Sequence, residues 1–95
     1  MTVVSAPVAT PSTAWTLTDP DAQQYGRQLA PGVYEFIEKR GRSEFQATVK
    51  LADYSPERRN YYCEAFYGSL ADLLAQFPDP QDWEWLLAEC IFEQL

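Results

Sequence analysis

Catalysis by a chain of 95 residues would need a nucleophile with a base, an acid paired with a base, or a metal site. The sequence contains no histidine, which is the commonest general base and the commonest metal ligand in proteins. The only two lysines, Lys39 and Lys50, are not placed beside a serine or cysteine by any periodicity. We therefore expect no catalytic residue and no enzymatic activity.

One group of carboxylates, Asp79, Asp82 and Glu84, is close enough in sequence to suggest a magnesium site. The spacing and the glycine of a calcium-binding loop are absent. Acidic residues also gather at helix N-termini because the helix dipole stabilises negative charge there. The dipole is the simpler explanation, and we expect neither a metal nor another cofactor.

Charge is distributed unevenly along the chain, whose formal net charge is −7. All seven Lys and Arg residues lie between Arg27 and Arg59. From Asn60 onward there is no basic residue but there are seven acidic ones: Glu64, Asp72, Asp79, Asp82, Glu84, Glu89 and Glu93. Such a segment repels nucleic acid and anionic lipid, and it favours either solubility or a basic protein partner; a solvated surface is the simpler interpretation. The aromatic cluster 61–67 lacks the positive groove of single-strand binders, so we expect no direct nucleic-acid binding.

Cellular location is suggested by the two cysteines and by hydropathy. The first residues lack the basic start and apolar run of a signal peptide, and no apolar segment is long enough to span a membrane. Cys63 and Cys90 suit a reducing compartment and are interpreted as small buried apolar residues. We expect a soluble, cytoplasmic protein.

The N-terminal residues 1–18 contain two prolines and no charge, which predicts a flexible arm before a single α+β domain at 19–95. Trp15 either docks on that domain or belongs to a binding motif. Asp19 and Pro20 favour the start of a short helix that reaches Gln28, before a turn at 30–32.

An antiparallel β-hairpin is predicted from strands at 33–38 and 44–51. The second strand alternates clearly, because its apolar residues Phe45, Ala47, Val49 and Leu51 occupy one face. The loop 39–43 contains Gly41 at a position that needs a positive φ. Its three basic residues either bind a phosphate or an acidic partner, or are simply solvated; solvation is the simpler interpretation.

Three helices are predicted at 56–67, 70–77 and 80–94 and are expected to pack against the hairpin. Ser55, Ser69 and Asp79 are the expected N-caps, and Gly68 the expected left-handed terminator of the first helix. The inner stripes are predicted as Tyr62, Cys63, Phe66 and Tyr67 in the first helix, and Leu70, Leu73, Leu74 and Phe77 in the second.

The last helix is apolar on two stripes, which raises the question of which stripe is buried. One stripe consists of Trp83, Leu86, Leu87, Cys90 and Ile91; the other consists of Trp85, Ala88, Phe92 and Leu95. We expect the first stripe to face inward, with Leu87 and Ile91 fully buried. Trp85, Phe92 and Leu95 are then expected to stay partly exposed.

The segments 67–70 and 83–94, with Ala52-Asp53-Tyr54-Ser55 before an aromatic helix, resemble a family of small uncharacterised cyanobacterial proteins over residues 33–94. The resemblance implies a cytosolic bacterial setting beside photosynthetic or carbon-metabolism machinery. It implies no catalytic role.

These features predict a non-catalytic protein-interaction module, an adaptor or regulator whose partner has a basic or apolar surface. The expected partner-binding residues are Trp85, Phe92, Leu95, Glu84, Glu89 and Glu93. One alternative is an acidic nucleic-acid mimic that blocks a DNA- or RNA-binding protein. Another is a structural protein that self-associates, for example as a homodimer.

Overall fold

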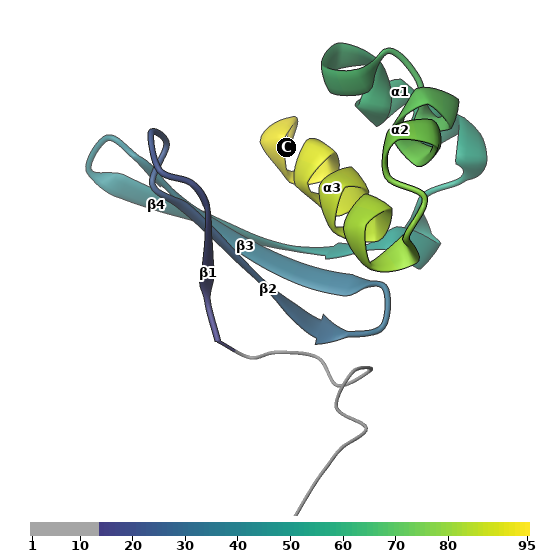
Figure 1. Ribbon diagram of the computed structural model, residues 1–95. Coiled ribbons are helices and arrows are strands. Elements are labelled where there is room, and N and C mark those ends of the chain that lie inside the picture. Colours follow the sequence, from purple (N-terminus) through teal and green to yellow (C-terminus); the bar gives the residue numbers. More distant parts are fainter. Residues whose placement is uncertain (1–13) are drawn as a thin grey trace, which may run out of the picture. The chain divides into compact units, whose positions relative to one another are not determined.

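The computed structural model describes residues 14–95 and shows an α+β protein, as the sequence predicts. It contains a four-stranded antiparallel sheet and three α-helices (Figure 1). The chain forms two compact units, with the boundary between Thr48 and Val49. A single domain over 19–95 stays a prediction, and residues 1–13 of the expected arm lie outside the described residues.

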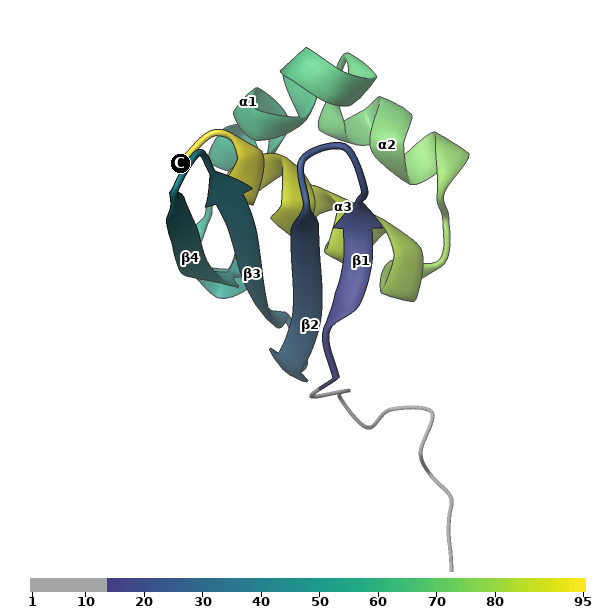
Figure 2. The same cartoon turned by 90° about the vertical axis from the view of Figure 1, so that its left-hand side faces the viewer.

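The four strands lie in the sheet in the order in which they occur in the chain, β1-β2-β3-β4 (Figure 2). Their bounds are β1 Thr16–Asp19, β2 Gln24–Ala30, β3 Val33–Arg40 and β4 Ser43–Lys50. Each connection is a tight turn, so the sheet is a simple meander. The predicted hairpin is therefore its second half.

The helix predicted from Asp19 to Gln28 is wrong, because β2 begins at Gln24 and the segment before it is a turn. Asp19 Oδ1 accepts hydrogen bonds from the backbone N–H groups of Asp21 and Ala22, at 3.1 and 3.2 Å. Gln23 then has a φ of 51°, in the left-handed region, where a helix cannot continue. Residues 16–18, predicted in the flexible arm, belong to β1.

The structure confirms the predicted turn at 30–32 and the positive φ of Gly41, and it corrects one loop length. Gly32, in the predicted turn, has a φ of 71° and Gly41 has a φ of 65°. The second turn contains only Gly41 and Arg42, not the five residues predicted, because both strands extend to its edges. The strand β4 alternates as predicted, although it ends at Lys50 and Leu51 begins a short 3-10 helix, Leu51–Asp53.

The helices of the second unit begin and end close to their predicted positions: α1 is Pro56–Tyr67, α2 is Leu70–Gln76 and α3 is Pro80–Glu93 (Figure 1). All three N-caps are confirmed, because the side chains of Ser55, Ser69 and Asp79 accept backbone hydrogen bonds at 3.0–3.2 Å. Gly68 ends α1 with a φ of 92°. Each cap of this kind stabilises a helix by about 1 kcal/mol.

The buried side of α1 differs from the prediction: Phe66 was predicted to face inward but is 53% exposed. The inward side contains Asn60, Cys63 and Tyr67, which recur at helical spacing. Asn60 Oδ1 accepts a hydrogen bond from Leu70 N at 2.9 Å, and the Tyr67 ring packs edge-on against Phe77. This polar anchor to α2 fixes the rotation of α1 and leaves Phe66 outside.

The helices α1 and α3 bring the two cysteines together. Cys63 and Cys90 are both buried, as predicted, and free, and the two thiols lie close enough to influence each other's pKa. Burial raises the pKa of both thiols, that of Cys90 to about 12. Gln94 Nε2 donates to the carbonyl oxygens of Tyr62 (2.7 Å) and Cys90 (3.2 Å) and so ties the end of α3 to α1.

We expect both thiols of the native protein to resist an aromatic disulfide reagent at pH 8, because a high pKa leaves little thiolate and burial blocks access. The rate should be more than about 100-fold below that of the protein in denaturant. The Cys63→Ala variant, measured in parallel, reports Cys90 alone. Labelling of the native protein at the denatured rate would contradict the expectation.

Candidate interaction surface

Three apolar side chains form a row across one face of the sheet. The register places Leu17 of β1 opposite Tyr25 of β2, and Tyr25 opposite Ile37 of β3. Directly opposed residues of antiparallel strands point to the same face, so these side chains are neighbours. Leu17 is 49% exposed and Tyr25 is 41% exposed.

Trp15, just before β1, lies next to this row. Its ring lines a shallow hollow of about 230 Å³ together with Tyr25 and Ile37. The guanidinium carbon of Arg27 lies 4.3 Å from the centre of the indole, a cation–π distance. Trp15 therefore docks on the sheet, one of the two alternatives for this residue, but keeps 38% of its surface exposed. We call Trp15, Leu17, Tyr25 and Ile37 the aromatic face.

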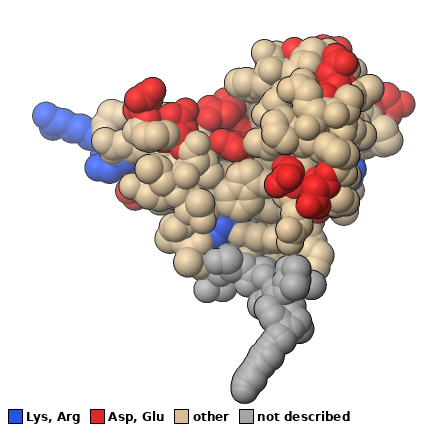
Figure 3. Space-filling model, in the orientation of Figure 1, with Lys and Arg blue, Asp and Glu red and all other residues tan. Residues whose placement is uncertain are grey.

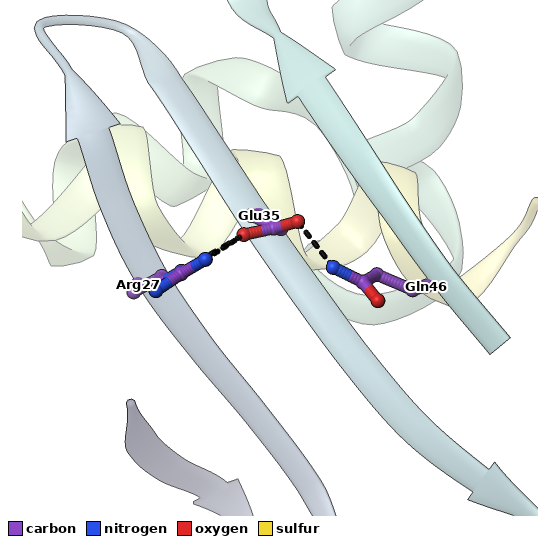
Figure 4. Close-up of polar contacts among 3 residues, drawn as sticks. All are labelled: Arg27, Glu35 and Gln46. Carbon is purple, nitrogen blue, oxygen red and sulfur yellow. Dashed lines mark hydrogen bonds and ion pairs between the residues drawn. The ribbon is translucent and has the colours of Figure 1, made fainter. Parts of the chain in front are cut away.

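A polar ladder crosses the sheet beside the aromatic face (Figure 4). Arg27 of β2 forms an ion pair with its cross-strand partner Glu35 of β3, with Nη2 2.7 Å from Oε1. The Gln46 amide of β4 donates to the other carboxylate oxygen of Glu35. The hydrogen bond from Arg27 lowers the pKa of Glu35, so the carboxylate stays charged. The ladder holds Arg27 beneath the indole of Trp15.

The opposite face of the sheet is buried, which makes the exposed apolar row unusual. Gly26 faces Phe36 and Gln24 faces Glu38, and all four residues are buried. An antiparallel sheet commonly has one dry face and one polar, solvated face. Here the second face also carries large apolar side chains. This second apolar face is therefore a candidate interaction surface.

The partner-binding residues predicted on α3 are only partly exposed to solvent. Leu87 and Ile91 are fully buried as predicted, but Phe92 is also fully buried, so its predicted exposure is wrong. The buried arc of α3 straddles both predicted stripes and consists of Leu87, Ala88, Cys90, Ile91 and Phe92. At helical spacing Ala88 and Phe92 lie one turn apart on the same side of Ile91, so the buried arc extends past Ile91 to include Phe92.

Other predicted residues of α3 are less buried. Trp85, Glu84, Glu89 and Glu93 are half-buried and Leu95 is exposed. Trp83 and Leu86, predicted to face inward, are also only half-buried. Acidic side chains are visible over the helices in Figure 3. Their role in partner binding stays a prediction.

No metal or membrane feature is found in residues 14–95. No cluster of three or more His, Cys, Asp or Glu residues could hold a metal ion within this range. No helix in the same range is long and apolar enough to cross a membrane.

The aromatic face was missed because its central strand was predicted as a helix. Its signal is present in the sequence, since Tyr25, Arg27 and Leu29 alternate with Gln24, Gly26 and Gln28 at the period of a strand. The helix-start pattern of Asp19 and Pro20 competed with that alternation.

Comparison with known proteins finds no matching family model, no matching curated protein and no matching solved structure. The resemblance to small cyanobacterial proteins therefore stays a prediction.

We expect Glu35→Gln to lower the free energy of unfolding at pH 7 by about 1 kcal/mol, because a charge-assisted hydrogen bond to Arg27 is lost. The pKa of Glu35 is lowered in the folded state, so its stabilisation is present above the unfolded pKa and is lost as pH falls through the folded one. The difference between the two proteins should therefore shrink at acidic pH.

Chemical denaturation at several pH values between 7 and 3 measures this effect. Asp21→Asn, in the exposed turn before β2, is the matched control for the loss of a carboxylate that forms no ion pair in the described structure. A constant difference between wild type and Glu35→Gln at every pH would contradict the expectation.

Proposed function

We propose that this protein is a non-catalytic interaction module that binds another protein through the aromatic face. The proposal rests on the apolar row of Leu17, Tyr25 and Ile37, of which Leu17 and Tyr25 are exposed, on the sheet face opposite the buried one. Interface hot spots favour Trp, Tyr and Arg at their centres. Trp15, Tyr25 and Arg27 supply one of each within a single small area.

The charge of the chain indicates which kind of partner surface the aromatic face would bind. The Arg27–Glu35 pair is locally neutral, so the aromatic face itself favours an apolar patch on the partner. The net charge of −7 favours a partner whose surroundings are basic, because long-range attraction accelerates encounter. The two free, buried thiols support a reducing compartment such as the cytoplasm.

The proposed binding site lies on the sheet and not on α3, where the sequence predicts it. Phe92 is buried and is not part of it. A supporting contact by Trp85 and Leu95, with Glu84, Glu89 and Glu93 around them, stays a prediction.

We expect Leu17→Ser combined with Tyr25→Ser to reduce recovery of bound proteins in a pull-down by about tenfold or more, because hot-spot side chains dominate binding energy. Tyr61→Ser is the matched control, since Tyr61 is 63% exposed on α1. Circular dichroism verifies that each variant is folded. Equal recovery by wild type, double variant and control would defeat the proposal.

The acidic nucleic-acid mimic remains the second candidate, favoured by the exposed carboxylates Glu64, Asp72, Asp79 and Asp82. A partner bound through these charges should lose affinity steeply between about 50 and 200 mM salt, whereas apolar docking should not. Replacing the four with Asn or Gln should abolish binding to such a partner. Salt-insensitive binding that survives this replacement would exclude the mimic.

A further inference from the structure

The strand β4 forms an edge of the sheet, and within the described sheet its only neighbour is β3. An edge strand presents a row of backbone N–H and C=O groups that can pair with another strand. Proteins usually protect such edges with short strands, bulges, proline or charged side chains, lysine above all. The other edge strand, β1, has four residues and an irregular register.

The strand β4 is neither short nor interrupted by proline, and its two charged residues, Glu44 and Lys50, have opposite signs. It has eight residues, contains no proline and is exposed at every second residue along its length. The exposed residues are Glu44, Gln46, Thr48 and Lys50. The strand is therefore long enough, and open enough on this face, to accept a further strand.

The sequence of β4 is complementary to itself in one antiparallel register. When Ala47 lies on the two-fold axis, Glu44 opposes Lys50 of a second copy, and the pair occurs twice by symmetry. Phe45 then opposes Val49, and Gln46 opposes Thr48. Opposite charges and apolar pairs at directly opposed positions stabilise antiparallel strands.

The direction of the backbone groups agrees with this register. Gly41 and Arg42 form a two-residue turn. In hairpins with such a turn the two flanking residues, here Arg40 and Ser43, normally form a hydrogen-bonded pair. Every second residue from Ser43 then directs its backbone groups to β3. Glu44, Gln46, Thr48 and Lys50 direct theirs outward, and these four residues form the hydrogen-bonded pairs of the proposed register.

Neighbouring registers are less favourable. A shift of two residues in one direction places Lys50 opposite Arg42, which brings like charges together. The same shift in the other direction places Glu44 opposite Ala52, beyond the end of the strand. The two charges of β4 therefore select one pairing.

We propose that two copies of this chain associate by antiparallel pairing of β4 with β4 across a two-fold axis at Ala47. The two sheets then become one continuous sheet of eight strands. Because opposed residues share a face, both aromatic faces lie on the same side of it. The dimer would present two copies of one binding surface to a partner.

Charge reversal tests this register. Glu44→Lys and Lys50→Glu should each weaken the dimer by roughly tenfold or more, because each places two like-charge pairs across the axis. The double variant should dimerise like wild type. An equimolar mixture of the two single variants should form heterodimers, since every opposed pair is then complementary.

Sedimentation velocity from about 1 to 100 μM measures these equilibria, and circular dichroism verifies that each variant is folded. In hydrogen exchange, the 43–50 segment should gain protection as the concentration rises. Glu57→Lys is the matched control for a changed charge on an exposed glutamate elsewhere, and it should not alter the dimer. A monomeric wild type at 100 μM, or two single variants that dimerise as wild type does, would overturn the proposal.

Discussion

The antiparallel register between β2 and β3 decides which side chains this sheet buries and which it exposes. Successive residues of a strand point to opposite faces, so a shift of one residue would exchange the two faces completely. The observed register pairs Gly26 with Phe36 on the buried face and Tyr25 with Ile37 on the other. The ion pair between Arg27 and Glu35 forms only in this register, and it therefore stabilises the alignment on which the aromatic face depends.

Arg27 links the electrostatics of the sheet to the position of Trp15. Its guanidinium pairs with Glu35 and also lies over the indole ring. A cation held on one side by a carboxylate is already ordered, so little additional side-chain entropy is lost when the indole packs on it. The indole is thus anchored to the sheet although much of its surface contacts water.

The second unit was largely predictable from sequence because its helix ends depend on local chemistry. Ser55, Ser69 and Asp79 bond to backbone groups two or three residues away, and Gly68 adopts a conformation that glycine favours. The alternation of β4 is also a local signal. The rotation of α1 was not predictable, since Asn60 fixes it through a bond to Leu70, ten residues further along the chain.

The first half of the sheet was missed for the opposite reason, because a local signal was misleading. Asp19 and Pro20 resemble a helix start, yet the Asp19 side chain caps a turn and Gln23 reverses the chain. The strand β2 is stabilised by its pairing with β1 and β3, which are separate segments of the chain. Strand preferences depend on such neighbours more than helix preferences do. The alternation of 24–30 therefore specifies a strand only when β1 and β3 are present to pair with it.

The net charge of the chain and the charges along β4 have opposite effects on the association of two copies. A charge of −7 on each copy makes copies of the chain repel one another at long range. Salt screens that repulsion over about 8–10 Å, whereas directly opposed side chains on a strand edge lie closer than this. Non-specific collisions between aromatic faces are therefore resisted by the whole chain, while contact along β4, where Glu44 and Lys50 balance locally, is resisted less. This difference favours one ordered mode of association over aggregation.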